Sequence, residues 1–129
     1  MNRRLGEVSE GAALEPLRLS LSAAANDRYW EGAGIDHPAR RARVLYPPLA
    51  ANLTILLVQG RVDEALLHTE QRLVCHRGAQ APVDLVVEGR VARRFVKRGR
   101  DYAVVEATVT TGAGELLWTS VSTFTPVRP

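Results

Sequence analysis

The chain has 129 residues, of which 46% are hydrophobic and 24% charged, and its formal net charge at pH 7 is +3. This length suits one globular domain and leaves no room for a second, and the composition is that of a folded rather than a disordered chain. Aromatic residues make up only 5% and form no basic and aromatic surface motif, so nucleic-acid binding is not expected.

The sequence pattern gives no sign of a membrane span, a secretory leader or a disulfide. The longest apolar stretch, Leu53 to Val58, is far too short to cross a bilayer. The arginines near the N-terminus are not followed by an apolar run, which argues against a signal peptide. Cys75 is the only cysteine, so no internal disulfide can form and a cytoplasmic location is expected.

The first part of the chain is expected to hold one short helix. Residues 1–14 are polar, small and without pattern, so they are interpreted as a flexible extension ahead of a single domain over residues 15–129. Ser22 precedes three alanines and is a suitable N-cap for a helix that runs to about Glu31. Two glycines should end this helix, and an irregular basic segment then continues to Tyr46.

A second, more hydrophobic helix is predicted from its boundary residues. Pro47 and Pro48 stand before it and Gly60 follows it, in line with the preference for proline in the first turn and glycine past the last. Apolar side chains occupy nearly every face between Leu49 and Val58. We therefore expect this helix to be enclosed by the rest of the domain.

From Leu66 onward the hydrophobic pattern changes to the period of two that is typical of β-strands. Four strands are predicted, at about Leu67–His76, Val83–Val96, Arg100–Thr111 and Glu115–Pro126. Glycine-containing turns should join the last three as hairpins. One enclosed helix followed by long antiparallel strands predicts an α+β fold in which a curled sheet wraps around a helix, called the hotdog, although the pattern alone leaves other α+β folds open.

Short segments in a consistent order along residues 17–127 resemble the MaoC-like dehydratase/hydratase superfamily. In the strand half these are His68-Thr69-Glu70-Gln71-Arg72, Arg77-Gly78, Val87-Glu88-Gly89-Arg90-Val91, residues 97–106 and Gly114-Glu115-Leu116-Leu117. Residues 45–53 resemble the start of the central helix in the N-terminal hotdog of two-hotdog members. The resemblance implies one hotdog domain in an enzyme that adds or removes water at the β-carbon of an acyl thioester. Coenzyme A or phosphopantetheine would be the substrate carrier, with no other cofactor.

In active members the pattern Gly-Asp-x-Asn-Pro-x-His supplies a carboxylate and an imidazole that together handle the reacting water. Here Asn26 and Asp27 stand where Gly-Asp is expected, but Gly32 occupies the histidine position. Asp36 and His37 are therefore the candidate catalytic pair, although adjacent residues on an extended chain point apart. The alternative is a loop whose Asp and His make local hydrogen bonds.

The candidate substrate contacts lie at the start of the second helix and in one basic turn. Backbone N–H groups at the helix start would meet the charge that develops on the thioester oxygen, but Pro48 lacks one such donor where active members usually carry His-Gly. Arginines in the basic turn would bind the phosphates of the carrier. Alternatively, they form a solvent-exposed tip that prevents a sheet edge from associating with other chains. The predicted substrate-binding residues are Tyr46, Pro48, Leu49, Asn52, Arg98 and Arg100.

Other residues that attract notice are interpreted as structural. His68 and His76 should share one face of a strand, but no acidic or thiol ligand accompanies them, so no metal site is expected. Cys75 lacks a recognisable activating partner and is interpreted as a structural thiol. Trp30 is expected to pack against the sheet edge, and Trp118 in the core or at an interface.

Three functions remain open, and the first is a component of an acyl-thioester dehydratase or hydratase that acts as a dimer. A single hotdog leaves one sheet edge exposed, so the chain is expected to pair with a second copy or with a different hotdog subunit. In a homodimer Asp36 and His37 would be catalytic, whereas in a heterodimer the partner would carry the intact pair. Alternatively, as Gly32 and Pro48 suggest, the chain is a non-catalytic subunit that shapes the acyl pocket and stabilises a catalytic partner. The third possibility is a hotdog thioesterase.

Overall fold

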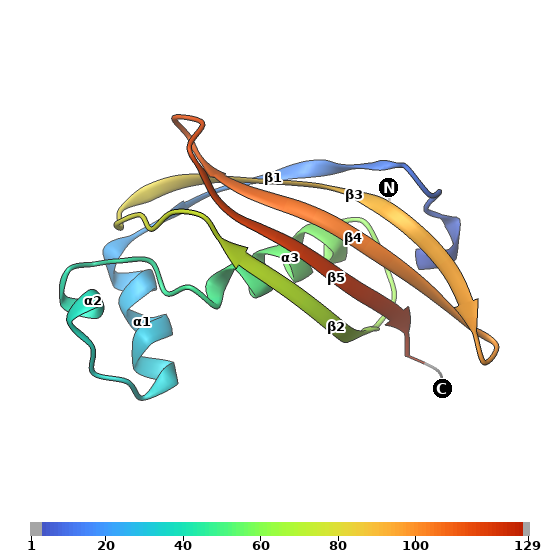
Figure 1. The fold of residues 1–129 in the computed structure, drawn as a ribbon, viewed down its shortest axis with the longest axis horizontal. Coiled ribbons are helices and arrows are strands. Elements are labelled where there is room, and N and C mark those ends of the chain that lie inside the picture. Colours follow the sequence, from blue (N-terminus) through green and yellow to red (C-terminus); the bar gives the residue numbers. More distant parts are fainter. Residues whose placement is uncertain (1–3, 128–129) are drawn as a thin grey trace.

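The computed structural model describes residues 4–127, which form one curled antiparallel sheet around a helix (Figure 1). The strands lie in the order β1-β3-β4-β5-β2, and α3 runs along the concave side of the sheet. This confirms the predicted α+β arrangement of a sheet wrapped around a central helix. In chain order the elements are a 3-10 turn (Leu5–Glu7), β1 (Ala13–Leu21), α1 (Ala23–Ala33), α2 (Pro38–Arg41), α3 (Leu49–Gln59), β2 (Leu66–Cys75), β3 (Val83–Lys97), β4 (Arg100–Thr111) and β5 (Leu116–Pro126).

The predicted elements form close to their expected boundaries. The Ser22 hydroxyl accepts a hydrogen bond from the backbone N–H of Ala25 at 3.0 Å, so it caps α1 as predicted. Gly60 follows the last residue of α3. The four predicted strands begin and end within about one residue of β2, β3, β4 and β5. Within residues 4–127, no helix has the length and apolar character needed to cross a bilayer.

The edge strand β1 is missing from the sequence prediction. It pairs with β3 so that Leu17, Leu19 and Leu21 lie opposite Val87, Leu85 and Val83. The alternation of these leucines is the strand signal, but Pro16 stands directly before it, inside β1. Proline is tolerated here because β1 is at the edge of the sheet and its register shifts between Leu14 and Leu17.

The segment before β1 packs more closely than the flexible extension expected for residues 1–14. Leu5 and Val8 are buried in the core. The Arg94 guanidinium donates hydrogen bonds of 2.6 Å to the carbonyl oxygens of both residues. The backbone N–H of Leu5 donates to the carboxylate of Glu64. Residues 4–12 are thus attached to the sheet and to the loop after α3, while residues 1–3 lie outside the described residues.

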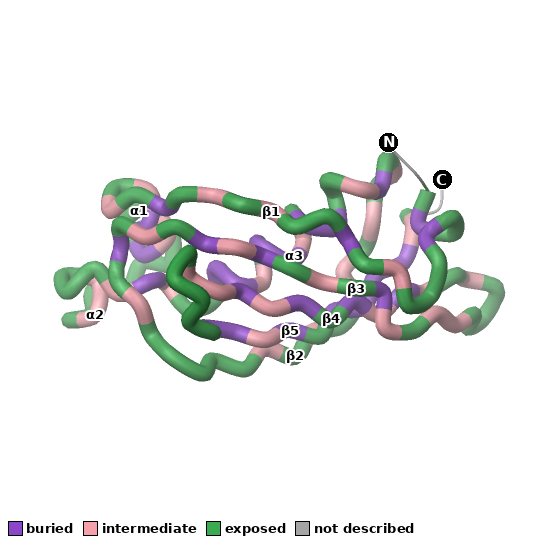
Figure 2. The backbone as a smooth tube through the Cα atoms, turned by 90° about the horizontal axis from the view of Figure 1, so that it is seen from above, coloured by how far each residue is buried: buried purple, intermediate pink, exposed green. Residues whose placement is uncertain are grey.

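Helix α3 is buried on one side only, which corrects the prediction that it is enclosed. Leu49, Leu53 and Leu57 are buried against the sheet, and buried positions follow α3 and the middle strands (Figure 2). On the opposite side Asn52 is exposed and the side chain of Leu56 is 52% exposed. The physical reason is that one sheet supplies one concave surface, and no second layer of this chain covers the other side of the helix.

Candidate functional site

Helices α1 and α2 form a lobe at one end of the sheet, beside the first turn of α3 (Figure 1). Asn26 and Trp30, one helical turn apart on α1, hold the chain that leads into α3. The Asn26 amide donates to the carbonyl oxygen of Val44 at 3.0 Å and accepts from the backbone N–H of Tyr46 at 3.0 Å. The Trp30 indole N–H donates to the same Val44 oxygen at 2.9 Å. Two side chains that are 2% and 6% exposed therefore fix where α3 begins.

His37 contributes to the lobe through its ring and one ring nitrogen. Its ring stacks on Trp30 with centroids 6.1 Å apart, and Tyr46 meets Trp30 edge-on at 5.0 Å. Nδ1 of His37 accepts a hydrogen bond of 3.0 Å from the backbone N–H of Ala39 and so caps α2. This bond assigns the neutral ring as the tautomer with the proton on Nε2. The lone pair that a general base needs is therefore used to hold the lobe together.

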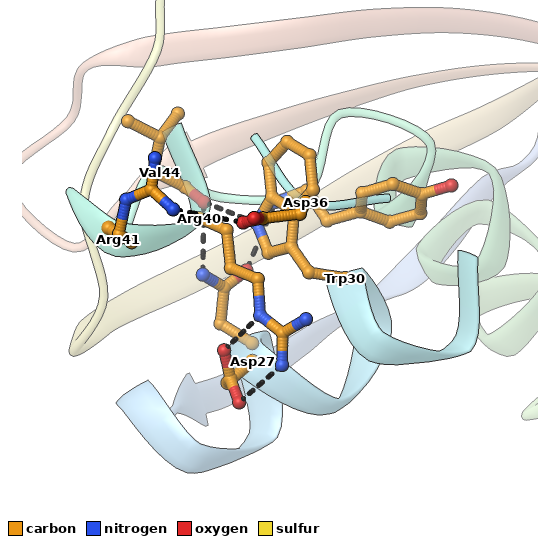
Figure 3. Close-up of polar contacts among 8 residues, drawn as sticks. Asp27, Trp30, Asp36, Arg40, Arg41 and Val44 are labelled. Carbon is orange, nitrogen blue, oxygen red and sulfur yellow. Dashed lines mark hydrogen bonds and ion pairs between the residues drawn. The ribbon is translucent and has the colours of Figure 1, made fainter. Parts of the chain in front are cut away.

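Asp36 is not joined to His37. Its carboxylate pairs with the Arg41 guanidinium at 3.0 Å, and its side chain is 81% exposed (Figure 3). Within residues 4–127 no hydrogen bond links the side chains of Asp36 and His37. The two predicted catalytic groups are neighbours in sequence, but each is engaged by a different local partner.

Asp27, which was predicted to stand at the position of the superfamily's aspartate, forms a two-pronged ion pair with Arg40. Its carboxylate oxygens accept from Nε of Arg40 at 2.7 Å and from Nη2 at 3.0 Å (Figure 3). These hydrogen bonds lower the pKa of Asp27 below its ordinary value, and they raise the pKa of Arg40. A carboxylate that is stabilised in its charged form is a weaker proton acceptor. Asp27 therefore ties α1 to α2.

The backbone donors at the start of α3 are also engaged. The N–H groups of Leu49, Ala50 and Ala51 donate to the carbonyl oxygens of Tyr46, Pro47 and Pro48 at 3.0, 3.3 and 3.1 Å. Leu49 and Ala50 are buried. The first turn thus offers no free pair of N–H groups for a thioester oxygen in this arrangement.

The predicted binding residues separate into two groups. Tyr46, Pro48, Leu49 and Asn52 lie together at the start of α3. Arg98 and Arg100 lie at the turn between β3 and β4, at the other end of the sheet from the lobe (Figure 1). Strand β3 has 15 residues between these ends, and a strand of that length extends roughly 45 Å. The chain therefore does not bring the two arginines to the start of α3.

A groove of about 790 Å³ opens at the lobe end, between the loop before β3 and the turn before β5. Its polar side chains are engaged by neighbouring side chains or by the backbone. Arg77 pairs with Glu115 at 2.6 Å, and Asp84 accepts from the Ser20 hydroxyl. The Gln80 amide donates to the Ala42 carbonyl oxygen at 2.8 Å. These contacts hold the loops around the groove in place.

His68 of β2 and His76, the residue after β2, do not lie on the same face of the sheet, which corrects the prediction. The register of β2 against β5 shifts between His68 and Glu70, and this bulge turns the later residues to the other face. The His68 ring stacks on buried Phe124 at 4.9 Å, whereas Nε2 of His76 lies 2.9 Å from the Thr119 hydroxyl. In the part of the chain that the structure describes, no group of three His, Cys, Asp or Glu residues is placed to hold a metal ion.

Comparison with known proteins gives the fold. No protein-family model and no curated protein matches the chain. Among solved structures, R-hydratase PhaJ1 from Pseudomonas aeruginosa superposes with a TM-score of 0.84 at 16% identity, over 99% of this chain and 88% of that one. The MaoC-like dehydratase from Rhodospirillum rubrum gives 0.76 at 17% identity, over 98% of both chains.

A chain of the HadBC (3R-hydroxyacyl-ACP dehydratase) complex from Mycobacterium tuberculosis is a third match. Its TM-score is 0.74 at 19% identity, over 88% of this chain and 94% of that one. The chain thus has the hotdog fold of the MaoC-like dehydratases and (R)-hydratases, and the resemblance predicted from its sequence is confirmed at the level of fold.

Proposed function

We propose that this chain is a component of an acyl-thioester dehydratase or hydratase in which it shapes the acyl pocket and supports a catalytic hotdog partner. The observation that carries this proposal is that each candidate acid–base group is already bound by a nearby residue of the lobe. Asp27 is held by Arg40 and Asp36 by Arg41, while Nδ1 of His37 caps α2. A pair of groups that exchanges protons with one water must converge on it, and these groups do not.

The open side of α3 supports a role in forming a pocket with a partner. Pro48 and Asn52 are exposed there, next to Tyr46, and Leu56 continues the same side with an apolar surface. A second hotdog subunit placed over this side would close a cleft lined by these residues. The HadBC complex, a match by fold, is a dehydratase described as a complex.

The substrate class follows from the fold relatives and the proposed pocket. We propose a thioester of coenzyme A or of a carrier-protein phosphopantetheine, acted on in the cytoplasm. Because Arg98 and Arg100 lie at the far end of the sheet, they would contact carrier phosphates only if the thioester were held mainly by the partner subunit.

The decisive experiment compares the chain alone with the chain bound to a catalytic hotdog partner. The purified chain is incubated with crotonyl-CoA, and loss of the enoyl absorbance is followed. We expect no turnover by the chain alone, and turnover once a co-purified partner with an intact Asp and His is present. Hydration by the isolated chain would overturn the proposal.

A homodimer that uses Asp36 and His37 is the second candidate. One observation favours it: Nε2 of His37 makes no hydrogen bond within the described residues, and the ring is exposed. If the isolated chain is active, His37→Ala and Asp36→Ala should abolish turnover while the fold is retained. Release of free thiol from an acyl-CoA without hydration would instead identify a thioesterase.

A further inference from the structure

The convex face of the sheet, on the side away from α3, carries a groove of about 360 Å³ toward the turn between β3 and β4 (Figure 1). The groove crosses β2, β5, β4 and β3, which are neighbours in the sheet. Its volume falls in the range of roughly 300–1,000 Å³ that is typical of small-molecule sites. It is separate from the lobe and from the open side of α3, so the proposed function does not use it.

One row of residues across the sheet gives the groove its shape. From β2 to β3 the row consists of Glu70, Thr123, Val104 and Arg93, each opposite the next. Long charged side chains therefore stand at the two ends and short side chains lie between them. Three strand spacings separate the Cα atoms of the end residues, which is roughly 14 Å. Val121 is 38% exposed beside this row and extends the apolar floor.

Three charged side chains of the groove lack a partner. Glu70, Arg72 and Arg93 are exposed, and within residues 4–127 their side chains make no ion pair or hydrogen bond. In the neighbouring row, by contrast, Arg90 and Glu106 pair at 2.9 Å on the same face. The groove thus keeps two cations and one anion available for a ligand.

Arg93 is held in place without being neutralised. Its guanidinium lies over the Phe95 ring, 4.7 Å from the ring centroid. Phe95 is in turn stacked on Tyr102 of β4, with centroids 4.9 Å apart and an angle of 5° between the rings. A guanidinium held by an aromatic face keeps its N–H groups for an anion. Because guanidinium groups bind phosphate oxygens in pairs, Arg93 and Arg72 favour a phosphorylated ligand.

Glu70 and the apolar floor narrow the class of phosphorylated ligand. A carboxylate accepts hydrogen bonds from hydroxyl groups and repels a phosphate, so the part of the ligand beside Glu70 should carry hydroxyls. A carboxylate binds ribose hydroxyls in this way in dinucleotide-binding folds. Val104 and Val121 offer an apolar surface on which a planar base can lie. A nucleoside phosphate has all three parts.

We propose that this groove is a binding site for a free nucleoside phosphate. Arg72 and Arg93 bind the phosphates, and Glu70 accepts hydrogen bonds from the two ribose hydroxyls. The base lies on the valine floor. Coenzyme A contains an adenine nucleotide too, but its ribose carries a phosphate in place of one hydroxyl, and this phosphate would approach Glu70. The groove should therefore prefer a free nucleotide to coenzyme A.

The inference goes beyond the proposed function, because it assigns a second ligand to the other face of the sheet. Binding is measured on the purified chain without a thioester or a partner. Failure of the nucleotide to bind leaves the thioester proposal standing. A wrong thioester proposal, in turn, leaves the nucleotide site standing.

Isothermal titration calorimetry of the purified chain with ADP, GDP, CDP and UDP tests the site. We expect at least one of the four to bind with one site per chain. Its nucleoside alone and inorganic pyrophosphate each lack a part of the ligand, so each should bind at least about tenfold more weakly. Coenzyme A should also bind more weakly than ADP.

Three results of this titration would overturn the proposal. The first is that none of the four nucleotides binds. The second is that pyrophosphate binds as tightly as the nucleotides, because the groove would then recognise charge only. The third is that coenzyme A binds more tightly than ADP, because the groove would then hold the substrate carrier.

Variants of the groove test the role of each charge. Arg72→Gln and Arg93→Gln should each weaken nucleotide binding by roughly tenfold or more. Glu70→Gln should reduce the preference for the nucleotide over its 2′,3′-dideoxy form by at least about threefold, since the dideoxy form has no hydroxyl for Glu70 to bind. An unchanged preference would contradict the contact between Glu70 and the ribose.

Arg18→Gln is the matched control for the two arginine variants. Arg18 lies on the convex face at β1, is exposed and makes no ion pair within the described part of the chain. This variant should bind the nucleotide as the unaltered chain does. Circular dichroism confirms that each variant is folded. Full binding by both Arg72→Gln and Arg93→Gln, or an equal loss in Arg18→Gln, would show that the nucleotide binds elsewhere.

Discussion

Thr54 of α3 and Ser120 of β5 share a hydrogen bond of 2.8 Å inside the interface between helix and sheet. Both residues are buried, and the Thr54 hydroxyl also donates to the Ala50 carbonyl oxygen at 3.1 Å. The Ser120 hydroxyl is therefore the donor to Thr54. This contact is a polar link between the helix and the sheet inside the core.

Thr54→Val should lower the free energy of unfolding by about 1–2 kcal/mol, because it leaves the buried Ser120 hydroxyl without an acceptor. Adding Ser120→Ala removes the unpaired hydroxyl. The double variant should therefore lose less unfolding free energy than the sum of the losses in the two single variants. Urea denaturation of the four proteins measures this cycle. Strictly additive losses would show that the bond does not contribute.

Gly89→Ala should destabilise the fold by about 1–3 kcal/mol through overpacking. A Cβ at Gly89 would lie 2.9 Å from Cδ2 of Leu57 and 2.9 Å from the carbonyl oxygen of Glu106. The glycine thus allows α3 to approach β3 closely. Thermal and urea unfolding measure the loss, with Gly78→Ala as the control, because its Cβ would meet nothing within 4 Å. Equal stability of the two variants would count against this close contact.

Most of the fold is predictable because its signals are local. The alternation in β3 and β4, the proline before α3 and the glycine after it each act within a few residues. β1 is missing from the prediction because its alternation of leucines is short and directly follows Pro16. The bulge at Thr69 leaves no mark in the hydrophobic pattern, yet one added residue reverses the face of every residue after it.

The candidate site is less predictable because its geometry depends on contacts between distant segments. The sequence identifies Asp36 and His37 by residue type, but it does not show that Arg41 and the Ala39 N–H engage them. Asn26 and Trp30 were missed as the residues that hold the start of α3. Their spacing of four residues places them on one helix face, which was the available signal, but the backbone they bind lies 14 to 20 residues further along.

Asn26→Ala should lower the free energy of unfolding by about 2–3 kcal/mol, because the partly buried Tyr46 N–H loses its acceptor and the Val44 oxygen loses one of its two donors. Chemical denaturation measures this loss. Asn52→Ala, on the exposed side of α3, serves as the matched control and should change stability by no more than about 0.5 kcal/mol. A small effect at Asn26 would mean that Trp30 alone holds the segment.

The ion pair between Asp27 and Arg40 should make stability depend on pH in the acid range. The hydrogen bonds from Arg40 lower the pKa of Asp27 in the folded chain below its ordinary value of 3.8. A lowered folded pKa means that the stabilisation is complete above the ordinary value and disappears as pH falls through the lowered one. Asp27→Asn removes the pair, so its stability deficit should be constant near neutral pH and shrink below about pH 4.

Urea denaturation of the unaltered chain and Asp27→Asn, from neutral to acid pH, measures the deficit. Because the pair is exposed, added salt should reduce it. Arg40→Gln removes the same contact from the other side and should show the same pH profile. Asp63→Asn is the control, since Asp63 is exposed and makes no ion pair within residues 4–127. A deficit at Asp27→Asn that stays unchanged down to the lowest pH at which the chain folds would show that the pair contributes nothing through its charge.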